Sequence, residues 1–232
     1  AVVAASDSAD LALTFFNADG STAGACGNAT RCIADYEMLR LGRTSLELKT
    51  ERGTLQAERQ GAYVSVNMGT PMLNWQDIPL AKAVDTLELP IPGTPTATGM
   101  GNPHCTFFVD DAEAAIIESL GPQIEHHPLY PERTNVQVAS CLGPDHLRMR
   151  VWDRGVGISL ASGSSSCATA VAAHRRGLTG KMVTLELDGG PIEVTWADDG
   201  VWMKGATARV FGGALAPDWL ASLAWARRGC RA

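Results

Sequence analysis

Hydrophobic and polar residues alternate in two similar stretches of the chain, and a glycine interrupts each stretch. Residues 45–58, SLELKTERGTLQAE, and residues 183–196, VTLELDGGPIEVTW, carry apolar side chains at every second position on both sides of the glycine. This alternation predicts strands with one buried face, and the glycine predicts a tight turn. Each stretch is therefore expected to form a two-stranded hairpin.

A helical pattern precedes each hairpin. After Cys26 and Ser162, runs of about a dozen residues reach Gly42 and Gly177, and glycine is typical of the position just after a helix. A loop of small residues, a helix and a hairpin thus occur twice in the same order. This internal repeat predicts two similar α+β halves related by a pseudo-twofold axis. A coincidence between two loops rich in small residues is the alternative interpretation.

The segment between the two copies is rich in proline and glycine. Residues 89–101, LPIPGTPTATGMG, are the natural hinge. We expect one domain in residues 1–95, a second in 96–205, and a C-terminal segment, 206–232, that returns to the first. In that segment an apolar helical face is expected to dock on the first domain rather than on a membrane; its residues are Trp219, Leu220, Leu223 and Trp225.

Composition narrows the class of protein. The chain has 232 residues, 45% of them hydrophobic and 19% charged, as in ordinary globular proteins. The net charge of −6 argues against nucleic acid as a partner, and no apolar run approaches the ~20 residues that cross a bilayer. The six cysteines form no C-x-x-C pair, so neither a metal site nor a disulfide framework is expected, and a reduced, cytoplasmic setting fits best.

The two loops of the repeat carry the candidate chemistry. If the halves face each other, the loops at Cys26 and Ser162 meet across one cleft, with both helix N-termini directed into it. Free N–H groups and positive dipole ends there would bind a carboxylate. A cysteine at a helix start is predicted to be reactive. The alternative is that Cys26 is a small buried filler.

Other polar residues flank predicted strands. Asn102 could bind a polar ligand group, and His104 could orient or exchange a proton with a thiol, although both also suit an ordinary turn. Asp153 and Arg154 precede Ser162 by nine and eight residues; together they could grip a zwitterionic ligand or form a surface ion pair.

Six motifs together resemble the diaminopimelate epimerase family: FNADGS, ACGNATRC, GNPH, PERTNV, DRGVG and ASGSSSC, in the family's order and spacing. The resemblance implies two pseudo-symmetric α+β domains, each a mostly antiparallel sheet wrapped round a central helix. It also implies racemisation at an amino-acid α-carbon without pyridoxal phosphate or metal. In that reaction one cysteine removes the α-proton and a second cysteine delivers a proton to the opposite face, converting LL- to meso-diaminopimelate for lysine and peptidoglycan synthesis.

The resemblance assigns a role to each matching residue. Cys26 is one member of the acid/base pair, Ser162 stands where the second cysteine is expected, and His104 and Asp153 lie near them. The residues implied to hold the small-molecule substrate are Asn17, Gly27, Asn28, Asn102, Asn135, Asp153, Arg154, Gly163 and Ser164. A homodimer is a further implication of the resemblance.

Ser162 departs from the family pattern. A serine hydroxyl is several pKa units less acidic than a thiol, and each unit of mismatch costs about 1.4 kcal/mol. We therefore predict a severely impaired two-base epimerase. An engineered substitution, a natural loss of activity and a change to one-base chemistry are competing explanations. A racemase or one-cysteine enzyme for another amino acid, and a non-catalytic amino-acid-binding protein, are the alternative functions.

The first residues depart as well. Members of the family open with a glycine-rich strand that is not found here, so by that comparison about fifty residues are expected to precede Ala1.

Overall fold

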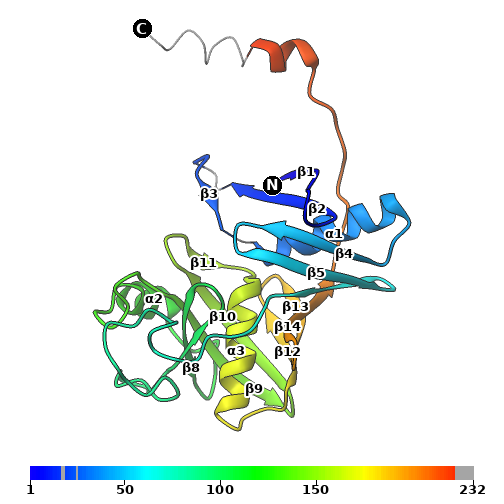
Figure 1. Ribbon diagram of the computed structural model, residues 1–232. Coiled ribbons are helices and arrows are strands. Elements are labelled where there is room, and N and C mark those ends of the chain that lie inside the picture. Colours follow the sequence, from blue (N-terminus) through cyan, green and yellow to red (C-terminus); the bar gives the residue numbers. More distant parts are fainter. Residues whose placement is uncertain (17–18, 25, 223–232) are drawn as a thin grey trace, which may run out of the picture.

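The computed structural model describes residues 1–16, 19–24 and 26–222. The first half contains β1 (Val2–Ala4), β2 (Leu11–Phe16), β3 (Thr22–Ala23), α1 (Gly27–Leu41), β4 (Ser45–Thr50), β5 (Gly53–Gln60) and β6 (Tyr63–Asn67). The second half contains β7 (Thr96–Gly99), β8 (Pro103–Phe108), α2 (Ile117–Glu125), β9 (Asn135–Gly143), β10 (His146–Asp153), β11 (Gly157–Ser159), α3 (Gly163–Arg175), β12 (Met182–Leu187), β13 (Gly190–Ala197) and β14 (Gly200–Ala206). The predicted α+β class is confirmed (Figure 1).

The predicted repeat is present in the structure. α1 and α3 are each followed by an antiparallel hairpin, β4–β5 and β12–β13. Gly42 and Gly177 follow the two helices with φ values of 66° and 70°, and Gly53 and Gly190 turn the hairpins at 117° and 110°. These are left-handed conformations that glycine adopts without a steric penalty. Local residue chemistry therefore specifies both copies.

The repeat extends further than the local pattern predicts. β2 runs parallel to β4, and β10 runs parallel to β12. Each helix therefore connects two parallel strands of the same sheet, on the face that it covers. This pairing gives both helices the same orientation relative to their strands.

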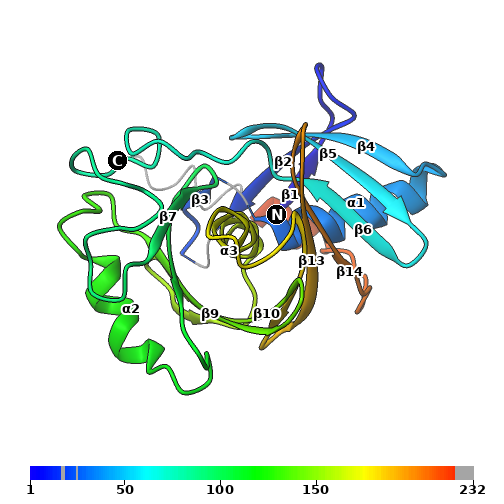
Figure 2. The same cartoon turned by 90° about the horizontal axis from the view of Figure 1, so that it is seen from below.

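The two helices are buried to different degrees. Every residue from Ser165 to Ala173 of α3 is buried, and strands of the second half curve around the helix (Figure 2). Alanine, serine and threonine dominate this helix, so the surrounding backbone approaches closely. In α1 the buried residues, including Thr30, Ala34 and Met38, follow a helical spacing along one face, whereas the side chain of Leu39 is 58% exposed. The central-helix arrangement is therefore complete around α3 and one-sided around α1.

One continuous sheet connects the two halves. Its order is β1-β2-β4-β5-β6-β14-β13-β12-β10-β9-β8-β7, and β14 joins β6 in antiparallel register, with Trp202 opposite Asn67. Three apolar clusters pack on the sheet, one against α1, one against α3 and one beneath α2. The junction between β6 and β14 holds the N-terminus of α1 near that of α3.

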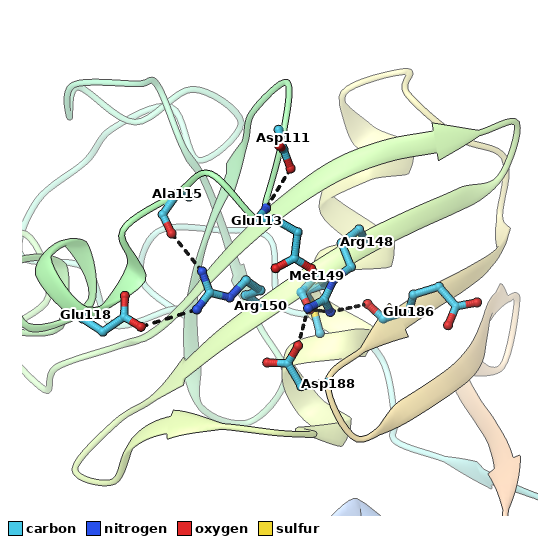
Figure 3. Close-up of polar contacts among 9 residues, drawn as sticks. All are labelled: Asp111, Glu113, Ala115, Glu118, Arg148, Met149, Arg150, Glu186 and Asp188. Atoms are coloured by element: carbon cyan, nitrogen blue, oxygen red, sulfur yellow. Dashed lines mark hydrogen bonds and ion pairs between the residues drawn. The ribbon is translucent and has the colours of Figure 1, made fainter.

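The face of β10 opposite α3 is polar. Leu147, Met149 and Val151 face the core, whereas Arg148 and Arg150 point outward (Figure 3). Arg148 contacts Glu113 at 2.5 Å and also pairs with Asp188, while Arg150 donates to the Ala115 carbonyl at 2.9 Å. Exposed ion pairs contribute little stability individually, but these contacts fix the segment that leads into α2 against the sheet.

Candidate active site

Cys26 and Ser162 occupy the same position in the two halves. Each is the N-cap residue of its helix in an extended conformation, with φ and ψ of −148° and 97° at Cys26 and −137° and 117° at Ser162. Neither side chain caps its own helix. The thiol and the hydroxyl are therefore not held by their own helices, and the first-turn N–H groups of each helix have no intrahelical acceptor.

The two helix tips are in contact. A Cβ atom on Gly163 would lie 3.5 Å from the Cα atom of Gly27 and 2.7 Å from the sulfur of Met203. A Cβ atom on Gly27 would lie 3.0 Å from the Met203 methyl group. Asn28 also reaches across and donates through Nδ2 to the Ala161 carbonyl at 3.4 Å. A Cβ atom at either position would press on the buried Met203 side chain, so both first helical positions favour glycine.

A cavity of about 380 Å³ opens at this contact. The predicted site residues on its wall are Cys26, Gly27, Asn28, Asn102, Asn135, Asp153, Ser162, Gly163 and Ser164. They come from both halves of the chain, and Cys26 and Ser162 are more than a hundred residues apart in sequence. Their gathering in one hollow is the geometry expected from the repeat.

Two predicted residues, His104 and Arg154, are not part of the cavity wall. His104 is fully buried behind it, with Nε2 3.0 Å from Oδ1 of Asn102. Arg154 donates its backbone N–H to Oδ1 of Asn135 at 2.9 Å and its guanidinium to the Glu132 carbonyl at 2.9 Å. Asn17 lies outside the described residues. The roles of His104 and Arg154 in binding or catalysis stay predictions.

Asn135 is largely occupied by the protein itself. Besides accepting from Arg154, it donates through Nδ2 to the Pro103 carbonyl at 3.0 Å. It ties the loop before β8 to the turn after β10. This use of both amide atoms favours a structural contribution alongside any ligand contact.

Burial shifts the pKa of two groups at the site, His104 and Asp153. Burial, followed by the guanidinium groups of Arg52 and Arg154, lowers the pKa of His104 to about 3, so its imidazole is neutral. Burial also raises the pKa of Asp153, and hydrogen bonds from neighbouring serine hydroxyls, including that of Ser162, oppose the rise. A neutral histidine thus lies behind the cavity wall, and a hydrogen-bonded carboxylate lies close to Ser162.

Arg52 is a site residue that the sequence does not reveal. It lies in the β4–β5 turn of the first half and lines the cavity. Its Nη1 donates to the Met100 carbonyl at 3.2 Å and lies 3.4 Å from Oδ1 of Asn102, both in the second half. An arginine in a hairpin turn is ordinarily a solvated residue, and only the tertiary pairing gives it another role.

A larger hollow, of about 620 Å³, lies elsewhere, between α1 and residues 207–211. Apolar side chains such as Leu39 and Phe211 form part of its wall, and it contains none of the predicted site residues. Within the described ranges, no group of three or more histidine, cysteine, aspartate or glutamate residues is arranged to hold a metal ion. In the same part of the chain, no helix combines the length and apolar character needed to span a bilayer.

The arrangement of helices and sheet is shared with solved structures of isomerase-type proteins. One is a predicted epimerase from Pseudomonas aeruginosa, with a TM-score of 0.60 and 17% identity over 89% of this chain and 79% of that one. Another is a probable proline racemase from Agrobacterium radiobacter, with a TM-score of 0.60 and 17% identity over 91% and 74% of the two chains. At this identity the likeness establishes the fold.

Sequence comparison gives the family. The family model described as diaminopimelate epimerase matches residues 1–73 and 96–210, and the chain belongs to that family. It is 51% identical over 213 residues to diaminopimelate epimerase of Rhodospirillum centenum, covering 89% of this chain and 73% of that protein. It is also 49% identical to that of Acidiphilium cryptum, covering 90% and 78%. The resemblance inferred from the six motifs is thereby confirmed.

Proposed function

We propose that this chain is a cofactor-independent isomerase that interconverts LL- and meso-diaminopimelate, with a proton-transfer step slowed by Ser162. One observation carries the proposal. Cys26 and Ser162 are the N-cap residues of two helices whose N-termini lie side by side, and both residues line one cavity. An α-carbon held between them would present one face to a thiol and the other to a hydroxyl.

The helix tips supply the binding site for the reacting carboxylate. N–H groups at Gly27 and Asn28 of α1 and at Gly163 and Ser164 of α3 lie in the first turns of their helices. Two positive dipole ends then act on one carboxylate. Removal of the α-proton adds further negative charge to that carboxylate. The same N–H groups therefore stabilise the carbanion more strongly than the substrate.

The two proton carriers differ in strength. Cys26 as a thiolate removes the α-proton on its face, and the opposite face receives a proton from the Ser162 hydroxyl. The reverse direction requires Ser162 to act as a base. A serine hydroxyl ionises far less readily at neutral pH than a thiol with a pKa near 8.5, so Ser162 is a poor base. Exchange on the Cys26 face is therefore expected to exceed net epimerisation.

Ser162 also supports a second candidate function. The cavity, the helix tips and Cys26 are compatible with an amino-acid-binding protein that has lost turnover. Tight binding of LL- or meso-diaminopimelate with no exchange on either face would favour that function. Restored turnover in a Ser162→Cys variant would favour an impaired epimerase.

The test is α-proton exchange in heavy water, followed by NMR for each stereoisomer separately. We expect exchange chiefly from the stereoisomer whose α-hydrogen faces Cys26. This exchange should be lost in Cys26→Ala. Exchange that persists in Cys26→Ala would overturn the assignment of Cys26 as the base.

The cellular setting proposed for this reaction is the cytoplasm. Cys26, Cys32 and Cys141 are exposed free thiols in the described part of the chain, which supports a reducing compartment. A homodimer stays a prediction, and sedimentation of the purified chain tests it.

A further inference from the structure

A row of polar side chains runs behind the cavity wall. Oδ1 of Asn102 lies 3.0 Å from Nε2 of His104, and Nδ1 of His104 lies 3.1 Å from Nε2 of Gln137. The same Gln137 nitrogen lies 3.0 Å from Oγ of Ser165, which lies 3.5 Å from Oδ1 of Asp153. His104, Gln137 and Ser165 are all 0% exposed. Bulk water does not reach these three residues, so their polar atoms depend on hydrogen-bond partners within the protein.

Charged groups fix the direction of the hydrogen bonds at both ends. Arg52 has only donors, so the Asn102 atom 3.4 Å from its Nη1 is the carbonyl oxygen. At the other end an ionised Asp153 has only acceptors, so the single hydroxyl proton of Ser165 is directed to it. Ser165 therefore accepts a hydrogen bond from Gln137.

The donors and acceptors in the middle of the row follow from the hydrogen-bond directions at its two ends. The amide nitrogen of Gln137 donates to Ser165 and to Nδ1 of His104, while its carbonyl oxygen accepts from the Thr106 hydroxyl at 3.2 Å. The Nδ1 atom of His104 is then an acceptor, and the single proton of the neutral imidazole resides on Nε2. That proton is donated to Oδ1 of Asn102.

We propose that Gln137 is a positioning residue that, through His104, fixes Asn102 as a hydrogen-bond donor to the substrate. Oδ1 of Asn102 is occupied by His104 and Arg52, so its NH₂ group is the part left for a ligand. An NH₂ group takes a carboxylate oxygen and rejects an ammonium group. The inference rests on the proposed function: Asn102 would hold the carboxylate of diaminopimelate that is distant from the reacting carbon.

The first test reads the histidine tautomer without any ligand. ¹⁵N NMR of uniformly labelled protein distinguishes protonated from unprotonated ring nitrogens, and His104→Gln assigns the signal. We expect a neutral ring with its proton on Nε2. In Gln137→Met, which keeps the side-chain length but removes the donor, we expect a mixture of both tautomers. A proton on Nδ1 in the unmodified chain, or an unchanged tautomer in Gln137→Met, would overturn the proposal.

The second test measures ligand preference by calorimetry. Lysine matches diaminopimelate except that it lacks the second carboxylate, so the ratio of their affinities reports on that group. We expect Gln137→Met to reduce the ratio at least about fivefold, which corresponds to roughly 1 kcal/mol. Ser140→Ala is the matched control, because Ser140 is buried on the same strand and accepts from the Ala112 N–H outside the row.

The outcomes separate the two hypotheses. If Gln137 has a purely structural role, Gln137→Met and Ser140→Ala should both lower the free energy of unfolding. Both variants should then leave the His104 tautomer and the affinity ratio unchanged. A different outcome is that diaminopimelate fails to bind while the Nε2 tautomer is present and sensitive to Gln137→Met. In that case the proposed function is wrong, and the proposed direction of the hydrogen bonds along the row is correct.

Discussion

Thr30 and Ser166 make the same pair of hydrogen bonds in the two halves of the molecule. Thr30 donates its backbone N–H and its hydroxyl to the Cys26 carbonyl, both at 2.9 Å. Ser166 donates the same two groups to the Ser162 carbonyl at 3.0 and 2.8 Å. Both N-cap residues are thus held by matching contacts. The side chains of the two N-cap residues differ in one atom, sulfur or oxygen.

Ser162→Cys is therefore expected to raise epimerisation. General acid–base catalysis by a well-matched group contributes about 10²–10⁴-fold, and we expect an increase of at least roughly 100-fold. Conversion of LL- to meso-diaminopimelate, measured by chiral chromatography, gives the rate. Ser119→Cys, which adds a thiol on α2, is the control. Equal and fast exchange from both stereoisomers in the unmodified chain would contradict the predicted impairment.

Alkylation should distinguish the cysteines. Cys26, Cys32 and Cys141 are exposed, whereas burial raises the pKa of Cys105 and of Cys167 to about 12. Because the thiolate is the nucleophile, iodoacetamide should label the three exposed cysteines in the folded protein and the two buried ones only after denaturation. Diaminopimelate should protect Cys26 and leave Cys32 reactive. Mass spectrometry of the digested protein measures both effects; protection of Cys32 alone would place the ligand elsewhere.

The local elements could be predicted from sequence because their causes are local. Alternating apolar residues specify the β4–β5 and β12–β13 hairpins, and Gly42 and Gly177 mark the ends of the helices. The two loops proposed to bind a carboxylate could be predicted from their small residues and from their place before a helix. The continuity of the sheet through β6 and β14 has no such local cause, because strand pairing between distant segments depends on the whole chain.

Gln137 shows why part of the site escaped sequence analysis. In the motif NVQVAS the alternation suggests that a glutamine points to solvent, yet β9 is buried on both faces over residues 135–140. α3 covers the side on which Gln137 meets His104 and Ser165. A polar residue in a strand acquires a role only when its tertiary neighbours are known, and the same holds for Arg52 in its hairpin turn.

Gly163→Ala tests the contact between the helix tips. The added Cβ would lie 2.7 Å from the Met203 sulfur, a distance that forces a displacement. Overpacking of this kind costs about 1–3 kcal/mol in the free energy of unfolding. We also expect weaker binding of diaminopimelate, since the displaced Met203 side chain lies against the first residue of both helices. Urea unfolding and calorimetry measure the two effects. Gly143→Ala is the control, because a Cβ atom added at Gly143 would meet no atom within 4 Å.

Burial of His104 should make stability depend on pH. Its pKa is about 3 in the folded protein, below the ordinary value of 6.5, so only the unfolded chain takes up this proton between those values. The free energy of unfolding should then fall by about 1.4 kcal/mol per pH unit as the pH drops below 6.5. Urea unfolding at pH 7, 6 and 5 measures the slope. His104→Gln should remove this contribution, whereas His146→Gln, at a partly exposed position on β10, should retain it. Parallel curves for all three proteins would contradict the prediction.

Asp153→Asn should separate activity from stability. Burial raises the pKa of the Asp153 carboxyl, although hydrogen bonds from Ser159, Ser162 and Ser165 oppose the rise. A folded pKa above the unfolded value means that ionisation destabilises the folded protein at neutral pH, so the asparagine variant should be at least as stable at pH 7. Its advantage should shrink as the pH falls through the raised pKa, because the carboxyl is then neutral.

Exchange on the Ser162 face should be lost in Asp153→Asn, since the carboxylate that accepts from that hydroxyl is gone. Urea unfolding at pH 7 and 4 measures stability, with the exposed Asp110→Asn as control. An Asp153→Asn protein that is less stable at pH 7 by more than about 1 kcal/mol, with no change at pH 4, would show instead that the ionised carboxylate stabilises the fold through its hydrogen bonds.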